Sequence, residues 1–253
     1  MSNRIDRFLA ERIREAWPSA RVLDLPAGDG NLTRALIDDG HTVIPADLFP
    51  ESFTQTGPKP VRADMNETLP FDDASFDAIV SQEGIEHLEN LPGFFRECRR
   101  ILRPGGRVWM TTPNFMDLSS RLAFFLTGMK SFHGGFPNEE TTLWGRDEER
   151  VYHGHAFTLP YFQIRYLLRT AGFGEVAVTG LKPSPTSRIL RTVVRPVSGI
   201  LIRRGFAKLA GKRRNHGIPR SPGPDLARQL RRDALSPELL CFKKICVTAV
   251  AEG

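Results

Sequence analysis

The sequence is poor in cysteine and has no long apolar run. Its three cysteines, Cys98, Cys241 and Cys246, show no paired spacing, which excludes a disulfide framework and a cysteine-based metal site; we expect reduced, buried thiols. No stretch of about eighteen uncharged apolar residues occurs. Charged residues recur between Met1 and Trp17, so we expect neither a spanning helix nor a signal peptide. The expected location is therefore cytoplasmic.

The positive charge of the chain is concentrated in one C-terminal segment. The 253 residues carry a net charge of +6, yet residues 203–233 hold ten basic residues against Asp225 and Asp233. That segment has a charge of +8, which leaves the remainder near −2. With 40% hydrophobic and 25% charged residues, the composition is that of one globular αβ domain with appendages. A partner that needs positive charge is expected at the C-terminal segment.

Strand and helix patterns alternate along most of the chain. Short apolar runs predict seven strands, at residues 21–25, 41–46, 61–63, 76–81, 108–111, 175–179 and 239–250. Helical spacing predicts helices at residues 3–16, 31–38 and 93–102 and between Thr158 and Gly172. This alternation predicts an α/β fold, a Rossmann-like, doubly wound and mostly parallel sheet with helices on both faces.

Composition divides the chain into three parts. Residues 1–180 are expected to form the core. Within it, the irregular stretch 114–157 is expected to be an insertion or lid over the sheet's C-terminal edge, where a substrate would bind. Residues 181–236 are rich in Pro, Arg and Gly and form a basic extension. Residues 237–253 return to the sheet as its final strand.

The first strand is followed by a glycine turn, Asp24-Leu-Pro-Ala-Gly28-Asp-Gly30, where a nucleotide cofactor would bind in such a sheet. Glycines allow the backbone to approach a ligand closely. Asp47, at the end of the second strand, lies 23 residues beyond Asp24 and can accept hydrogen bonds from both ribose hydroxyls. The pattern indicates an adenosine ligand.

The adenosine could belong to NAD or to S-adenosylmethionine. The NAD fingerprint requires a third small residue where this chain has Thr33, and Asp24 and Asp29 would repel a pyrophosphate. S-adenosylmethionine carries no phosphate and has a cationic sulfonium and ammonium. The acidic residues therefore favour S-adenosylmethionine.

Several motifs occur together in a fixed order. They are Val22-Leu-Asp-Leu-Pro-Ala-Gly-Asp-Gly-Asn-Leu-Thr33, Ala46-Asp47, Leu69-Pro-Phe-Asp-Asp-Ala-Ser-Phe-Asp-Ala-Ile-Val80, Glu86-His87-Leu88 and Ile101-Leu-Arg-Pro-Gly-Gly-Arg107. Residues 20–115, and more weakly residues 155–180, closely resemble the class I S-adenosylmethionine-dependent methyltransferases, in particular the type 11 or UbiE-like group. The resemblance implies a methyl-transferring enzyme that releases S-adenosylhomocysteine.

The resemblance also implies which residues bind the cofactor. In it, Asp24, Gly28 and Gly30 hold the methionine portion, Asp47 holds the ribose, and Leu48 flanks the adenine. The remaining assignments place Asp64 and Met65 at the adenine edge, Gln82 and Glu83 at the closing side, and Pro26 and Ala27 in the loop. Pro26-Ala27 stands where many relatives have Gly-Cys, and Pro26 stiffens the loop and lacks an N–H donor.

The acceptor is less well defined by the sequence. His87 is the candidate catalytic base, since imidazole titrates near neutrality, and the alternative is a structural histidine that bonds a nearby loop. His133, His153 and His155 bracket the irregular segment, but no third ligand stands beside the His153-Gly-His155 pair, so we expect no metal. The resemblance favours O-methylation of a small molecule, a sugar or a lipid-linked glycan.

The basic extension has two candidate partners. One helical face carries Arg188, Arg191 and Arg195, and the opposite face carries Leu190, Val194, Val197 and Leu201. Residues 188–214 could therefore contact an anionic membrane as a peripheral surface. Pro196 and other breakers argue against one continuous helix, and a helix that covers the core with a solvated basic face is the preferred interpretation.

Nucleic acid is a weaker alternative, because only one aromatic residue, Phe206, occurs between residues 203 and 233 to stack on bases. The sequence thus leaves open an RNA methyltransferase. It also leaves open a non-catalytic protein that binds S-adenosylmethionine or docks on a membrane.

Overall fold

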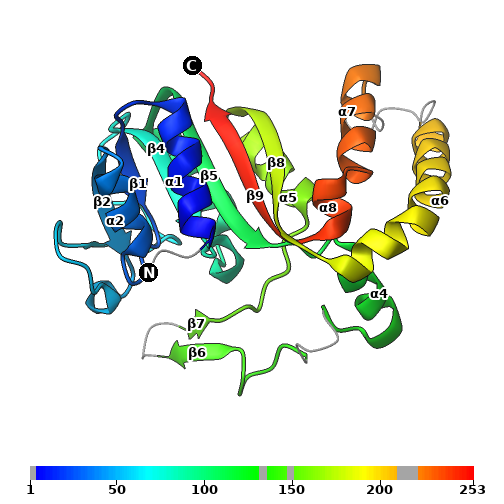
Figure 1. Cartoon of the computed structure of the whole chain (residues 1–253), viewed down its shortest axis with the longest axis horizontal. Helices are drawn as coiled ribbons and strands as arrows, with labels where there is room; N and C mark the ends of the chain where they lie inside the picture. Colours follow the sequence, from blue (N-terminus) through cyan, green and yellow to red (C-terminus); the bar gives the residue numbers. More distant parts are fainter. Residues whose placement is uncertain (1–3, 131–135, 147–150, 210–221) are drawn as a thin grey trace.

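A seven-stranded mixed sheet with helices on both faces forms the body of the molecule (Figure 1). The computed structural model describes residues 4–130, 136–146, 151–209 and 222–253. The elements are α1 (Arg4–Ala16), β1 (Arg21–Asp24), α2 (Asn31–Asp38), β2 (Thr42–Asp47), η1 (Pro50–Ser52), β3 (Val61–Arg62), β4 (Phe76–Gln82), η2 (Ile85–His87), α3 (Leu91–Ile101), β5 (Leu102–Pro113), α4 (Leu118–Thr127), β6 (Leu143–Arg146), β7 (Val151–His153), α5 (Tyr161–Thr170), β8 (Phe173–Pro183), α6 (Pro185–Leu209), α7 (Pro224–Ala234), α8 (Pro237–Cys241) and β9 (Phe242–Ala251).

The strand order is β3-β2-β1-β4-β5-β9-β8. The first five strands run parallel, and β9 lies antiparallel between β5 and β8. The order reverses after β1, where a doubly wound sheet opens a crevice at the carboxyl ends of its strands. The predicted fold class is confirmed.

Alternation along the central strands builds a core on each face of the sheet. Leu23 packs into the cluster that α3 and α5 cover, whereas its neighbour Val22 packs into the cluster that α1 and α2 cover. Side chains of successive strand residues point to opposite faces, so a strand buried on both sides must be apolar throughout. This explains why the strands read as continuous apolar runs.

The final strand begins later than the sequence predicts. Residues 237–241 form the short helix α8, and the strand starts at Phe242. Ser236 accepts a hydrogen bond from the Leu239 N–H as an N-cap, and Pro237 occupies the first turn. These start signals outweigh the apolar character of Leu239 and Leu240, which is suited to either element.

The extension differs from its prediction, because α6 continues through Pro196 as one helix. Figure 1 shows that this helix changes direction along its length. Leu190 and Val194, in its first half, pack against Leu118 and α8. Val197, in contrast, is 56% exposed, so the expectation of a core-covering helix applies to the first half of α6 only.

The segment 114–157 supplies α4 and the β6–β7 hairpin. Asp117 caps α4 by accepting a hydrogen bond from the Ser119 N–H. The hairpin pairs only with itself and lies below the sheet in Figure 1. Among the described helices, none is both long enough and apolar enough to cross a membrane.

Candidate active site

The loop after β1 is tied to the end of β2 by one carboxylate. Asp47 accepts a hydrogen bond from the Gly28 N–H at 2.8 Å through Oδ2, and another from the Phe49 N–H at 2.8 Å through Oδ1. A carboxylate offers about four lone-pair positions, so each oxygen can accept one more hydrogen bond. Asp47 is therefore held in place with acceptor capacity left for two ribose hydroxyls.

A cavity of about 270 Å³ opens beside this loop. Eight residues predicted to be functional lie on its wall: Pro26, Gly28, Asp47, Leu48, Asp64, Met65, Glu83 and His87. The β6–β7 hairpin contributes Tyr152 and His153, and Tyr152 packs edge-on against Phe49 with ring centroids 5.4 Å apart. Apolar Leu48 and Met65 next to a polar aspartate fit an adenosine.

Four predicted cofactor residues do not reach this wall. Ala27 is buried and donates its N–H to the carbonyl oxygen of Ala46, and Gln82 stands at the end of β4 behind the cavity. Gly30 begins α2 in a left-handed conformation with φ of 84°. A Cβ there would lie 2.5 Å from the Phe53 ring, so Gly30 is required by packing inside the loop.

Asp24 is buried behind the same loop. One oxygen accepts a hydrogen bond from the Thr33 hydroxyl at 2.6 Å, and the other has no hydrogen-bond partner among the described residues. Burial raises the pKa of Asp24 to about 7, against the opposing effect of the Thr33 hydrogen bond. The side chain supports the loop from beneath. The methionine contacts that the resemblance implies for Asp24 and Gly30 stay predictions.

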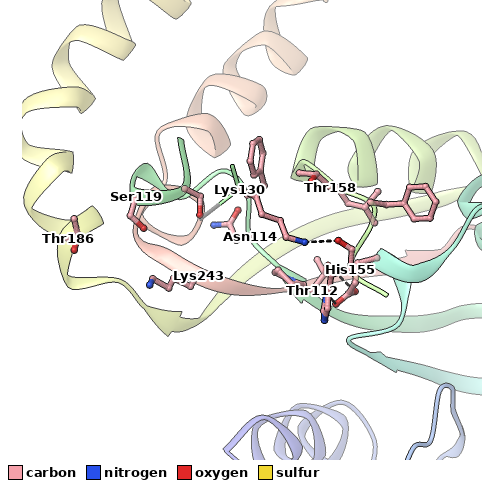
Figure 2. A pocket seen from close by; sticks show the side chains of 14 residues that line it. Thr112, Asn114, Ser119, Lys130, His155, Thr158, Thr186 and Lys243 are labelled. Carbon is pink, nitrogen blue, oxygen red and sulfur yellow. Dashed lines mark hydrogen bonds and ion pairs between the residues drawn. The ribbon is translucent and has the colours of Figure 1, made fainter. Parts of the chain in front are cut away.

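A second cavity of about 350 Å³ lies on the other side of η2 (Figure 2). Its wall combines the end of β5, α4, the segment before α5 and β9, and it includes Thr112, Asn114, Ser119 and Lys130. Lys130 donates a hydrogen bond to the carbonyl oxygen of His155 at 2.7 Å. Hydroxyl, amide and ammonium groups on a partly aromatic wall suit a polar, hydroxylated acceptor.

Glu86, His87 and His155 connect the two cavities. His87 lies on the wall of the first cavity, and Glu86 and His155 lie on the wall of the second. The two imidazole rings have centroids 4.8 Å apart. Glu86 is only 2% exposed, and burial, with a contribution from Glu83, raises its pKa to about 7. Burial, His87 and Lys130 together lower the pKa of His155.

No metal is expected from the sequence, because no third ligand stands beside His153 and His155 along the chain. That reason does not hold in the structure. His155 does have further potential ligands beside it, because ligand atoms of Glu86, His87 and His155 all lie within 4.8 Å of one another. His153 belongs elsewhere, since its Nε2 lies 2.8 Å from Glu89 Oε1. His133 lies outside the described residues. The adjacent Glu86-His87 pair after β4 was the only local signal for this group.

The sheet order, the antiparallel β9, the glycine loop after β1 and the acidic end of β2 define the fold of a class I methyltransferase. Residues 23–110 match the family model described as methyltransferase domain. This match covers about a third of the chain, and over these residues the chain is similar to the methyltransferase domain that the model describes.

Curated relatives match part of the chain. A mitochondrial ubiquinone biosynthesis O-methyltransferase of Rattus norvegicus is 33% identical over 111 residues, which is 39% of this chain and 32% of that protein. A demethylmenaquinone methyltransferase of Beutenbergia cavernae is 34% identical over 120 residues, 44% of this chain and 49% of that protein. The matches span half or less of these relatives' lengths.

Solved structures match the fold over nearly the whole chain. A SAM-dependent methyltransferase from Archaeoglobus fulgidus is 17% identical, with a TM-score of 0.56, over 97% of this chain and 94% of that one. A Haemonchus contortus phosphoethanolamine N-methyltransferase 2 is 16% identical, with a TM-score of 0.53, over 98% of this chain and 52% of that one. At these identities the likeness is one of fold.

Proposed function

We propose that this protein transfers a methyl group from S-adenosylmethionine to an oxygen atom of a small-molecule, sugar or lipid-linked acceptor. The observation that carries the proposal is the meeting of two cavities at His87. One cavity has an adenosine-type wall around Asp47, and the other has a partly aromatic wall that carries Lys130 and His155. An in-line displacement needs the donor and acceptor held on opposite sides of one point.

The residues of the first cavity bind and orient the donor. Asp47 accepts hydrogen bonds from the ribose hydroxyls, and Leu48 and Met65 flank the adenine. Gly28 faces the cavity and contacts the methionine portion, while Asp24 and Gly30 maintain the loop. Bound S-adenosylmethionine supplies an electrophilic methyl group, whose carbon–sulfur bond breaks as the bond to the acceptor oxygen forms, and S-adenosylhomocysteine is released.

The residues at the junction act on the acceptor. A hydroxyl group loses its proton when its oxygen is methylated, so a group that favours that loss must stand beside the oxygen. His87 is the candidate for this role, because it lies at the cofactor cavity next to His155 of the acceptor cavity.

Oxygen as the accepting atom has support from the sequence relatives. The name of the Rattus norvegicus relative specifies O-methyl transfer in ubiquinone biosynthesis. The name of the Beutenbergia cavernae relative specifies demethylmenaquinone as its acceptor. Only the first name specifies oxygen as the accepting atom, and both names are compatible with a quinone-type acceptor.

We further infer that the protein contacts an anionic membrane through α6, the described part of the predicted 188–214 segment. The side chains of Ile189, Val193 and Leu201 recur on one side of α6 and are 73%, 71% and 60% exposed. Three arginines of α6 and three of α7 line a cavity of about 760 Å³ between these helices: Arg191, Arg195, Arg203, Arg228, Arg231 and Arg232. Ile189 and Val193 lie on the side of α6 opposite Arg191 and Arg195, and an apolar side with arginines on the other side is typical of a helix that lies on an anionic membrane surface.

The decisive test is methyl transfer itself. The protein is titrated by calorimetry with S-adenosylmethionine, S-adenosylhomocysteine and NAD, and is then incubated with isotopically labelled donor and a panel of phenols, sugars and lipid-linked glycans. Micromolar binding of both adenosyl ligands, no binding of NAD and label on an acceptor oxygen are expected. Binding without transfer to any acceptor would favour a non-catalytic protein, and label on RNA would favour the RNA methyltransferase.

A further inference from the structure

The group of Glu86, His87 and His155 has the composition of a metal site. Each residue offers one ligand atom, and these atoms lie within 4.8 Å of one another. We propose that these three residues bind one divalent transition-metal ion at the junction of the two cavities. Two further observations indicate that the group faces a cation: the orientation of the His87 ring and an oxygen of Glu86 that has no hydrogen-bond partner among the described residues.

The first contact orients His87. Its Nδ1 lies 3.1 Å from the backbone carbonyl oxygen of His153. A carbonyl oxygen can only accept a hydrogen bond, so Nδ1 carries a proton, and in the neutral imidazole Nε2 is then the nitrogen that can bind a metal. Histidine ligands of metals are typically held this way, with the second ring nitrogen donating to a carbonyl or carboxylate. The lid thus prepares His87 as a ligand.

The second observation concerns a buried oxygen of Glu86. Its Oε2 accepts a hydrogen bond from the Thr112 hydroxyl at 3.1 Å, whereas Oε1 has no hydrogen-bond partner within the described part of the chain. Oε1 lies 3.8 Å from Nδ1 of His155, too far for a hydrogen bond. A carboxylate that is 2% exposed is costly with an unpaired oxygen, and a cation between Glu86 and His155 would satisfy it.

The neighbouring charges already have partners. Glu83 accepts a hydrogen bond from the Thr111 hydroxyl and lies 2.5 Å from the Lys244 ammonium. Lys130 donates to the carbonyl oxygen of His155. Both lysines also act electrostatically on the three-residue group, Lys244 on Glu86 and both lysines on His155, and Glu83 adds negative charge near it.

The ligand types indicate which ion binds. Two imidazoles and one carboxylate suit zinc or a neighbouring first-row ion, whereas magnesium and calcium prefer oxygen ligands. Three protein ligands leave at least one coordination position for the acceptor oxygen, whose proton then becomes more acidic. This role for the ion rests on the proposed methyl transfer, whereas ion binding does not.

The test uses the full chain after metal removal with a chelator. Calorimetric titration with Zn²⁺, and visible absorption on titration with Co²⁺, are expected to show one site per chain. Glu86→Gln and His155→Ala should each weaken binding tenfold or more, since each removes one of three ligands. His153→Gln is the matched control: it removes an imidazole that bonds Glu89 but keeps the carbonyl that orients His87.

Two readouts separate the possible failures. Thermal unfolding checks that each variant is folded. Glu86→Gln preserves the shape of a buried side chain, and the side chain of His155 is half exposed, so at least one of the two variants should fold like the wild type. Absence of Zn²⁺ and Co²⁺ binding, or equal binding by wild type and both variants, would overturn the metal site. If S-adenosylhomocysteine still binds in that case, the methyltransferase proposal stands; loss of both overturns both.

Discussion

The carboxylate of Asp47 accepts a hydrogen bond from the backbone N–H of Gly28 at 2.8 Å. This bond joins the end of β2 to the loop after β1, two segments that belong to adjacent parallel strands. The orientation of the carboxylate is thus set by the protein before any ligand binds. Preorganised hydrogen-bond groups lose less entropy on binding, so Asp47 should contribute strongly to affinity.

Replacement of Asp47 tests the cofactor cavity. Asp47→Ala is predicted to weaken S-adenosylmethionine binding roughly tenfold or more, because hydrogen bonds to a charged group contribute about 1.5–3 kcal/mol. Calorimetry measures the change. Glu51→Ala is the control, since Glu51 is an exposed acid on the nearby η1 that does not line the cavity. Equal affinity of Asp47→Ala and wild type would refute the ribose assignment.

Alanine substitutions at the two glycines of the loop should have different effects, one on cofactor binding and the other on stability. Gly28→Ala meets no neighbouring atom, so beyond the ~1–2 kcal/mol of backbone strain at its φ of 52° it should mainly weaken binding at the cofactor cavity. Gly30→Ala meets the Phe53 ring and should lower stability by more than the ~1–2 kcal/mol of a left-handed alanine. Gly105→Ala, which has a positive φ and no neighbour within 4 Å, provides the control for backbone strain alone. Urea denaturation and calorimetry on all three variants separate the effects.

His87→Ala is predicted to lose methyl transfer and to retain S-adenosylmethionine binding. The residue lines the cofactor cavity, and its ring contacts that of His155, which lines the second cavity. The measurement is S-adenosylhomocysteine formation with an acceptor that the wild type methylates, beside a calorimetric titration of the donor. Full activity of the variant would exclude His87 from acting on the acceptor.

The stability of the protein should depend on the protonation of Asp24. Burial raises its folded pKa to about 7 from 3.8, so the folded state favours the protonated form. The resulting stabilisation is complete below about pH 4 and is lost as the pH rises through 7. Asp24→Asn mimics the protonated carboxyl, and its free energy of unfolding should fall less between pH 5 and pH 8 than that of wild type.

Urea denaturation at both pH values measures this difference. Asp38→Asn, an exposed acid on α2, should behave like wild type. If Asp24→Asn and wild type show the same change between pH 5 and pH 8, Asp24 is not protonated in the folded protein near neutrality.

Membrane contact through α6 predicts a vesicle preference. Wild type should sediment with vesicles that contain phosphatidylglycerol and less with pure phosphatidylcholine, and the difference should shrink at high salt. Ile189→Ser and Val193→Ser together should reduce sedimentation several-fold through loss of apolar contact. Thr192→Ala, exposed on the same helix, should not. Retention on RNA without vesicle binding would support the nucleic-acid alternative instead.

Sequence motifs anticipated the cofactor cavity better than the acceptor side. Asp47, Leu48, Asp64 and Met65 lie on one wall because strand ends in a parallel sheet meet at one edge, which the order of the elements already implies. Gln82 does not line this cavity, because a residue's position at a strand end does not specify which way its side chain turns, and its predicted contact with the cofactor stays a prediction.

The extension shows a different limit of sequence reasoning. Proline lacks an N–H and disfavours a helix interior, yet α6 continues past Pro196. The helix is held at its start, where Ser187 donates a hydrogen bond to Asp117 and Leu190 packs on Leu118. Such contacts with distant elements override local propensity.

The order of strands and helices, the glycine loop and the acidic end of β2 followed from the sequence alone, because periodicity and turn chemistry act between near neighbours. Only the tertiary structure placed His155 beside Glu86 and His87, since the lid folds back over 68 residues of chain to bring it there. Only the tertiary structure decided which side of α6 is covered, because burial depends on what packs against a helix as well as on its own pattern. The class of protein was therefore determined locally, whereas the acceptor site was assembled by long-range contacts.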